Sequence, residues 1–179
     1  MNKKPNNTQI KCLITDFDET FFDTSLTRNL RKEKDKDWNK IYGLIPQFKM
    51  YDGWQEVLNY LKENNIMLAV VSGAKTELLK KTFAHFGIEP DAVVGFQWCY
   101  RKPNAKLLHM ALEKLGLDPS EAIVTGNSTK DELQAQRAGV RFVAAAWDSL
   151  YKEELAQRCL MAQKPQDLIK ILEESQVSA

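Results

Sequence analysis

The stretch DFDETFFDT, residues 16–24, places acidic side chains among phenylalanines directly after the apolar stretch KCLIT. Acidic groups at the buried end of a strand cost free energy unless a cation, a proton or a ligand compensates them. Asp16 and Asp18 lie only two residues apart. Two such carboxylates repel each other unless a divalent cation or a proton holds them together. The pair therefore indicates a chemical site at the end of a strand.

The elements that position these acids alternate between strands and helices. Short apolar runs predict strands, and segments with an apolar side chain every three or four residues predict helices. The expected strands are 10–17, 66–73, 91–96, 121–127, 141–147 and a short one near 158–162, and the expected helices are 51–64, 76–87, 103–116, 129–139 and 165–175. This alternation predicts an α/β fold, a Rossmann-like three-layer sandwich with a central, mainly parallel sheet.

Several polar side chains stand at the ends of the expected strands or shortly after them: Asp16, Asp18, Ser72, Lys102, Asn127 and Asp131. Ligands bind beyond the carboxyl ends of parallel strands, so these residues should converge on one crevice. Carboxylate, carbonyl and phosphate oxygens, together with waters, suit Mg²⁺. An aspartate can attack phosphorus to form an aspartyl-phosphate, and a neighbouring acid can transfer the proton. A lysine and a hydroxyl can bind the remaining phosphate oxygens.

The four motifs in which these residues stand resemble those of the haloacid dehalogenase (HAD) superfamily of phosphohydrolases. The first motif, D-x-D-x-T, is DFDET at residues 16–20, and the second, a Ser or Thr that ends a strand, is Ser72 in VVSGAK. The third, a lysine often followed by proline, is Lys102 in RKPNAKLL, and the fourth, commonly G-D-x-x-x-D, is GNSTKD at residues 126–131. Order and spacing agree over roughly residues 10–147, which makes the set far more specific than any one motif.

The resemblance implies a role for each matching residue and a HAD-like fold. Asp16 is expected to be the nucleophile and Asp18 the general acid/base. The expected substrate-binding residues are Thr20, which steadies the turn, Ser72, Gly73 and Lys102, and the expected Mg²⁺ ligands are Asp16, the backbone carbonyl of Asp18, Asn127 and Asp131. The implied enzyme is a magnesium-dependent phosphatase that hydrolyses a phosphomonoester through an aspartyl-phosphate intermediate.

Two departures from the family pattern motivate an alternative. Asn127 stands where the family usually has a metal-ligating aspartate, and its amide oxygen brings no charge to a metal. Glu19 adds an acid beside the site, which should raise its demand for a cation. The alternative is a HAD-like binding or regulatory protein with weakened catalysis. A phosphoacceptor receiver domain is rejected, because the third strand ends in VVGFQ without the aspartate that would accept the phosphate.

Residues 24–50 break the alternation of strands and helices. The mixed-charge run RKEKDKD, residues 31–37, predicts a solvated helix face or loop, and the alternative is a small lid over the site. The segment is too short for a typical helical cap. We therefore expect one HAD-like hydrolase domain over residues 1–179, with 24–50 as a short insertion or minimal cap. Trp98 and Tyr100 fit the lining of a substrate approach and core packing equally well.

Charge and composition limit the partners. The chain has 25 basic and 24 acidic residues and a net charge of +1, so no global field favours nucleic acid or a membrane. The three cysteines show no metal-ligand spacing and no disulfide framework. The start lacks the apolar core of a signal peptide, so the cytoplasm is the expected compartment. The expected partner is a phosphorylated substrate, a small molecule or a bulkier one, and the sequence indicates no oligomeric state.

Overall fold

The computed structural model describes residues 9–148, 150–151 and 153–177. Within them the central sheet has six strands: β1 (Cys12–Thr15), β4 (Met67–Val71), β5 (Ala92–Val94), β6 (Ala122–Gly126), β7 (Arg141–Ala145) and β8 (Leu160–Ala162). They lie in the order β5-β4-β1-β6-β7-β8, and every neighbouring pair is parallel. The predicted α/β fold is thereby confirmed. The chain leaves β1 toward β4 and later returns to β6 on its other side, so the strand order reverses beside β1, where such sheets bind ligands.

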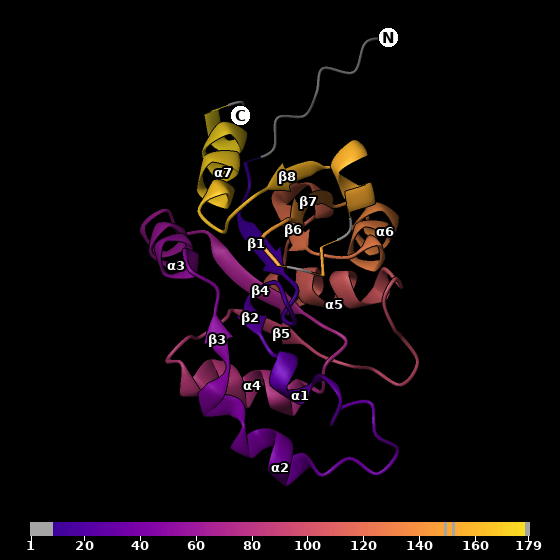
Figure 1. Ribbon diagram of the computed structural model, residues 1–179. Helices are drawn as coiled ribbons and strands as arrows, with labels where there is room; N and C mark the ends of the chain where they lie inside the picture. Colours follow the sequence, from indigo (N-terminus) through magenta and orange to yellow (C-terminus); the bar gives the residue numbers. More distant parts are fainter. Residues whose placement is uncertain (1–8, 149, 152, 178–179) are drawn as a thin grey trace.

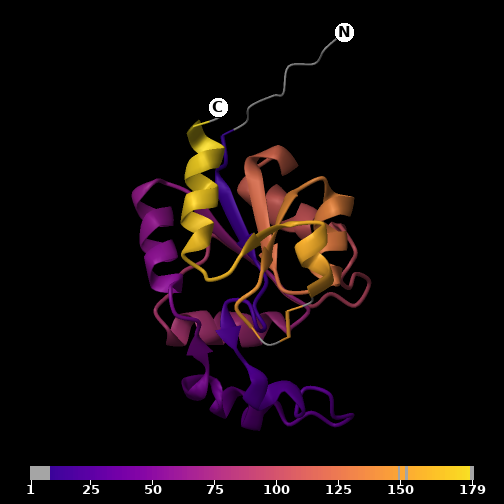
Figure 2. The same ribbon diagram turned by 45° about the horizontal axis from the view of Figure 1, so that its top comes forward.

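Helices cover both faces of this sheet (Figures 1 and 2). One face packs against α3 (Trp54–Glu63) and α7 (Asp167–Val177), and the other packs against α5 (Lys106–Leu115) and α6 (Thr129–Ala138). An apolar core lies on each face of the sheet, and alternate residues of β1 pack into the two cores. Leu13 packs into the first core, under α3 and α7, and Cys12 and Ile14 pack into the second core, under α5 and α6. Burial on both faces explains why the strands are continuous apolar runs.

The phenylalanines of the first motif form the aromatic centre of the first core. Phe17, Phe21 and Phe22 are fully buried, and the Phe21 ring stacks on Trp54 with ring centroids 4.1 Å apart. Phe83 on α4 (Thr76–His85) closes the cluster, with its ring 5.1 Å from that of Phe21. Burying one such side chain stabilises a fold by about 1.5–3 kcal/mol. The apolar half of DFDETFFDT thus anchors the turn that carries the acids.

The segment that breaks the alternation, together with the two residues before it, forms small elements beyond the end of the sheet, next to α4 (Figure 1). They are β2 (Phe22–Asp23), α1 (Ser25–Arg28), α2 (Trp38–Gly43), η1 (Ile45–Gln47) and β3 (Lys49–Met50), and β2 pairs antiparallel with β3. The hydroxyl of Tyr42 on α2 donates to Glu77 on α4 over 2.9 Å, and Lys75 Nζ lies 4.7 Å from the Trp38 ring. The insertion is therefore tied to α4.

The helix and strand boundaries lie close to the predicted ones, and the largest shifts, of three residues, are at the starts of the helices expected from residues 51 and 103. The helix expected from residue 103 begins at Lys106, because residues 101–104 form a turn in which Asn104 N donates to Arg101 O over 2.8 Å. Two further short helices, η2 (Pro119–Glu121) and η3 (Glu153–Gln157), precede β6 and β8. No helix in the described part of the chain is both long enough and apolar enough to cross a membrane.

Candidate active site

The first motif is held at the junction of β1 and β6. Asp16 follows β1 directly, and its backbone N–H donates to the carbonyl oxygen of Thr125 on β6 over 2.9 Å. The carbonyl of Thr20 accepts two indole N–H groups, from Trp54 at 2.9 Å and from Trp147 at 3.0 Å. The Thr20 side chain is fully buried, and its hydroxyl has no hydrogen-bond partner among the described residues. Thr20 therefore lies behind the turn that aims the acids.

Lys102 joins the first motif to the fourth. Its Nζ lies 2.7 Å from Asp16 Oδ1 and 2.6 Å from Asp131 Oδ1, and all three side chains are largely buried. Burial alone would lower the pKa of Lys102, but the two carboxylates outweigh it and raise that pKa above its ordinary value. The sequence prediction that these three residues meet at the strand ends agrees with this geometry.

Burial raises the pKa of Asp16 to about 7. The Lys102 ammonium opposes this rise, whereas the charges of Asp131 and Asp18 add to it. Since the Asp16 side chain is only 13% exposed, water does little to stabilise its charged form. A cation at this carboxylate would therefore favour its ionised form.

The fourth motif begins where β6 ends. Ser128 is the N-cap of α6, and Asp131 Oδ2 accepts hydrogen bonds from the Ser128 backbone N–H at 3.1 Å and from its hydroxyl at 2.5 Å. A Cβ on Gly126 would lie 2.6 Å from Asp131 Cγ, so glycine is required there for the aspartate to keep its place. Asn127 is buried and donates its amide N–H to the Glu19 carbonyl over 3.2 Å.

The second motif lies on the neighbouring strand end. β4 pairs with β1 in a register that aligns Val70 with Thr15, so Ser72 stands level with the first motif at the same edge of the sheet. The Ser72 hydroxyl is buried and accepts from the Ala74 backbone N–H over 3.1 Å, while Gly73 is exposed. The structure thus puts Asp16 and Asp131 in contact with Lys102, and Ser72 directly after the adjacent strand β4.

A cavity of about 470 Å³ opens at this edge, with an acidic and a basic wall; it is lined by Asp16, Asp18, Glu19, Arg28, Arg31, Lys32, Asn127, Ser128 and Leu150. The basic wall, formed by Arg28, Arg31 and Lys32, comes from the insertion and was not predicted from the sequence. Residues 32–37 are exposed, as expected of the charge run, but the Arg31 side chain points inward and is only 16% exposed. Arg28, Arg31 and Lys32 follow the i, i+3, i+4 spacing of one helical face, and this spacing was the available signal.

Both arginines contact acids of the first motif. Arg31 places Nη2 2.7 Å from Asp18 Oδ1 and Nη1 3.0 Å from Asp18 Oδ2. Arg28 Nη2 lies 3.0 Å from Glu19 Oε1. Burial raises the pKa of Glu19, and the hydrogen bond from Arg28 opposes that rise. The guanidinium of Arg28 therefore places a positive charge beside the Glu19 carboxylate, the added acid that the sequence predicted to need one.

Glu19 also has an unusual backbone. Its φ is +58°, in the left-handed region that few residues other than glycine adopt. Its backbone N–H donates to the Phe22 carbonyl over 2.9 Å, and its side chain accepts from Tyr51 at 3.3 Å. The Tyr51 hydroxyl also lies 2.5 Å from Asp148, so the two carboxylates share its single proton. These contacts hold Glu19 in a backbone conformation that usually favours glycine.

The oxygen donors beside Asp16 suit Mg²⁺. Asp16 contacts Lys102 through Oδ1, so its Oδ2 remains for a cation. Asn127 donates its amide N–H to the Glu19 carbonyl, so its amide oxygen remains as well. Mg²⁺ prefers a few such oxygen ligands and retains several waters, which fits two side chains and the Asp18 carbonyl. Both carboxylate oxygens of Asp131 already accept hydrogen bonds, from Lys102 and from Ser128. Among the described residues, no group of three His, Cys, Asp or Glu side chains could by itself hold a metal ion.

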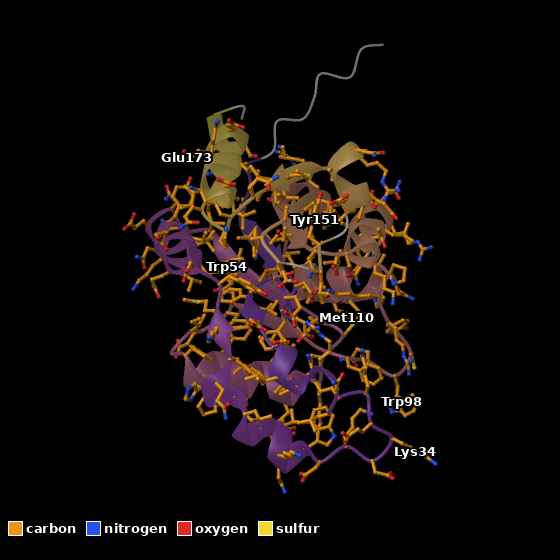
Figure 3. All side chains as sticks on the ribbon, viewed as in Figure 1. Lys34, Trp54, Trp98, Met110, Tyr151 and Glu173 are labelled. Carbon is orange, nitrogen blue, oxygen red and sulfur yellow. The ribbon has the colours of Figure 1, made fainter. Side chains whose placement is uncertain are left out.

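The aromatic residues before Lys102 lie on the surface. Trp98 is 84% exposed and Tyr100 is 38% exposed, so core packing is excluded for Trp98. Figure 3 shows Trp98 at the outer edge of the molecule, on the same side as Lys34 of the insertion, whereas Trp54 lies inside. Neither residue lines the cavity beside Asp16, so the lining of a substrate approach stays a prediction.

Comparison with known proteins gives consistent matches. The family model described as haloacid dehalogenase-like hydrolase matches residues 2–145. A protein of Caldanaerobacter subterraneus, provisionally named pyrophosphatase PpaX, is 37% identical over 105 residues, which are 57% of this chain and 48% of that protein. A phosphoglycolate phosphatase of Haemophilus influenzae is 28% identical over 131 residues, 70% of this chain and 58% of that enzyme.

Among solved structures, CbbY from Rhodobacter sphaeroides in complex with phosphate superimposes with a TM-score of 0.74 at 16% identity. The match covers 89% of this chain and 96% of that one, and at this identity it supports the fold alone. The chain spans about half the length of the curated relatives it matches.

Proposed function

Because this chain belongs to the haloacid dehalogenase-like hydrolase family, we propose that it is a magnesium-dependent phosphatase that hydrolyses a phosphomonoester through an aspartyl-phosphate intermediate. The observation that carries the proposal is the position of Lys102 Nζ, between Asp16 at 2.7 Å and Asp131 at 2.6 Å. A buried lysine beside a carboxylate nucleophile offsets the negative charge that would otherwise repel a phosphate. The names of the relatives, a pyrophosphatase and a phosphoglycolate phosphatase, support hydrolysis of a phosphorylated compound.

In the first step a carboxylate oxygen of Asp16 attacks phosphorus. The bond from phosphorus to the leaving oxygen breaks, and Asp18 gives that oxygen its proton. Ser72 and Gly73, at the neighbouring strand end, bind phosphoryl oxygens together with Lys102. Thr20 acts at a distance, because its carbonyl is fixed by two indole groups and holds the turn that aims both acids.

In the second step water attacks the aspartyl-phosphate. Asp18 accepts the proton of the water, inorganic phosphate leaves, and Asp16 is restored as a carboxylate. When bound, Mg²⁺ supplies positive charge that offsets the charge of the phosphoryl oxygens. Its expected ligands are Asp16, the Asp18 carbonyl and Asn127, with Asp131 as a ligand directly or through water.

The expected substrate is a phosphorylated compound, either a small molecule or a bulkier one. The insertion at residues 24–50 contributes the basic wall of the cavity, and we propose that it serves as a minimal cap on a single HAD-like hydrolase domain over residues 1–179. A cap of this size leaves the site more open than a full helical cap would.

The test is hydrolysis of an aryl phosphate with Mg²⁺, with a chelator, and in Asp16→Asn. Activity should disappear with the chelator and in the variant, because the nucleophile and the cation are both needed. Asp23→Asn is a matched control, since Asp23 lies in the same stretch but does not line the cavity, and its Oδ1 accepts from the Ser25 backbone N–H. Activity retained in Asp16→Asn would refute the assigned nucleophile. A screen of sugar phosphates, nucleotides and phosphopeptides would then identify the substrate class.

The neutral Asn127 amide favours a second candidate, a binding or regulatory protein with weakened catalysis. This candidate predicts no turnover on a broad phosphate panel, even at high Mg²⁺, together with binding of a phosphate analogue. Asn127→Asp separates the two, because an added carboxylate should strengthen Mg²⁺ binding and raise the activity of an impaired enzyme. If the Asn127→Asp variant stays inactive but still binds the analogue, the regulatory candidate is supported.

A further inference from the structure

The basic wall of the cavity binds Asp18, the acid that the proposed function needs for proton transfer. Arg31 contacts both oxygens of the Asp18 carboxylate, at 2.7 and 3.0 Å. The Thr24 hydroxyl donates to Asp18 Oδ1 as well, over 2.6 Å. Both oxygens are therefore engaged by residues of the insertion or its start. While these contacts last, neither oxygen is free to approach a leaving group.

Arg31 can leave Asp18 only if another anion replaces the carboxylate. The Arg31 side chain is 16% exposed, and a guanidinium that is mostly removed from water loses free energy when it loses its charged partner. Two parallel N–H groups of a guanidinium match the two oxygens of a carboxylate or a phosphate. A substrate that carries such a group beyond its reacting phosphate would offer Arg31 an equivalent partner.

The cavity has room and charge for such a group. Its volume of about 470 Å³ lies in the range of sites for small organic ligands, which exceeds the needs of a single phosphoryl group. Arg28 and Lys32 line the same cavity as Arg31 and Asp16. A second anion next to the basic wall would be close to three basic side chains.

We propose that Arg31 is a specificity-determining residue that selects phosphomonoesters carrying a second anionic group, a carboxylate or another phosphate. The second anion takes Arg31 from Asp18 and thereby frees the Asp18 carboxylate for the leaving oxygen. This inference rests on the proposed phosphatase function. A purely structural role, in which Arg31 is a permanent counter-ion of Asp18, predicts no such dependence on the substrate.

The test compares three probes of similar size: ethyl phosphate, phosphoglycolate and the bisphosphate of ethylene glycol. The wild type should hydrolyse the two probes with a second anion at a higher kcat/KM than ethyl phosphate. Arg31→Gln should lower kcat/KM for these two by about 10- to 100-fold, the effect of losing hydrogen bonds to a charged group. For ethyl phosphate it should raise kcat/KM, because Asp18 is released. The probe that depends more on Arg31 distinguishes a carboxylate from a phosphate.

Two further variants make the result specific. Lys34→Gln removes a charge from an exposed side chain of the same loop and should leave the preference for a second anion intact. Arg31→Lys keeps a charge but loses the two parallel N–H groups, so it should fall between the wild type and Arg31→Gln. If thermal unfolding shows that Arg31→Gln is not folded, Arg31→Lys carries the test. An equal loss on all three probes, or an equal effect of Lys34→Gln, would overturn the proposal.

A binding measurement separates this inference from the proposed function. Calorimetric titration of the wild type without Mg²⁺ should show tighter binding of phosphoglycolate than of ethyl phosphate, and Arg31→Gln should abolish the difference. If the wild type hydrolyses no phosphomonoester but shows this preference, the phosphatase proposal fails and the role of Arg31 in selecting the anion stands. Equal affinity for both compounds in the wild type would refute the selection.

Discussion

Asp16→Asn should make the metal-free protein more stable at pH 8, although it removes the proposed nucleophile. The pKa of Asp16 is raised from its ordinary value of 3.8 to about 7, chiefly by burial. An acid with a higher pKa in the folded protein binds its proton more tightly there, so its contribution favours folding at low pH. That contribution is lost as the pH rises between the two pKa values. Asparagine has nearly the same shape and carries no charge at any of these pH values.

The size of the effect follows from the two pKa values. Each pKa unit corresponds to about 1.4 kcal/mol, so the charged form of Asp16 costs at most about 4 kcal/mol above pH 7. Relaxation of the site and entry of water should reduce this, and we expect a gain of about 2 kcal/mol for the variant. Lys102 keeps its contact with Asp131 at 2.6 Å, so the substitution does not leave the ammonium without a partner.

The assay is urea unfolding of both proteins in a chelator at pH 5, 6, 7 and 8. The difference in unfolding free energy should grow with pH up to about 7 and then level off. Addition of Mg²⁺ should reverse the order, because the ion binds the folded wild type more tightly. Asp23→Asn is a control of opposite sign, since a hydrogen bond from Ser25 lowers the pKa of Asp23. A difference that does not change with pH, or a wild type that is more stable at pH 8 in chelator, would refute the reasoning.

Substitutions at three further positions test other parts of the site. Gly126→Ala should cost about 1–3 kcal/mol in thermal unfolding and lower activity, because its Cβ would displace Asp131; an unchanged Tm would contradict this close approach. Glu19→Gly should relieve the left-handed backbone but leave Arg28 without its carboxylate, so we expect a net change of less than about 1 kcal/mol in urea unfolding. Glu19→Ala also removes the carboxylate but keeps the backbone strain, so it should be about 1 kcal/mol less stable than Glu19→Gly. Trp54→Phe removes an indole N–H from a buried carbonyl and should cost about 1–3 kcal/mol, measured by denaturant titration; no loss would show that the second indole alone holds the turn.

The sheet and the contact at its edge could be predicted because they depend on local patterns. Apolar runs indicated the strands, and parallel strands place their ends together, so Asp16, Lys102 and Asp131 had to meet. The glycine before Asn127 also follows from the motif. These inferences need only the order of the elements along the chain.

The basic wall could not be predicted in the same way. The charges around Arg31 alternate in sign, and such a run is usually solvated, as its neighbours at residues 32–37 are. The inward direction of Arg31 depends on how the insertion folds back over Asp18, and this is a tertiary contact. The φ of +58° at Glu19 was hidden for a similar reason, because its neighbours rather than its own preference impose it.

The double hydrogen bond on the Thr20 carbonyl has a consequence for the order of assembly. Trp54 lies 34 residues after Thr20, but Trp147 lies 127 residues after it. At a synthesis rate of about 5–20 residues per second, about 6–25 s separate the two ends of the second bond on the ribosome. A nascent chain therefore carries the acids of the first motif long before Trp147, just after β7, arrives to fix their direction. We expect truncated or stalled chains to hold the acidic turn without its final orientation, so that the chemistry begins only when most of the sheet exists.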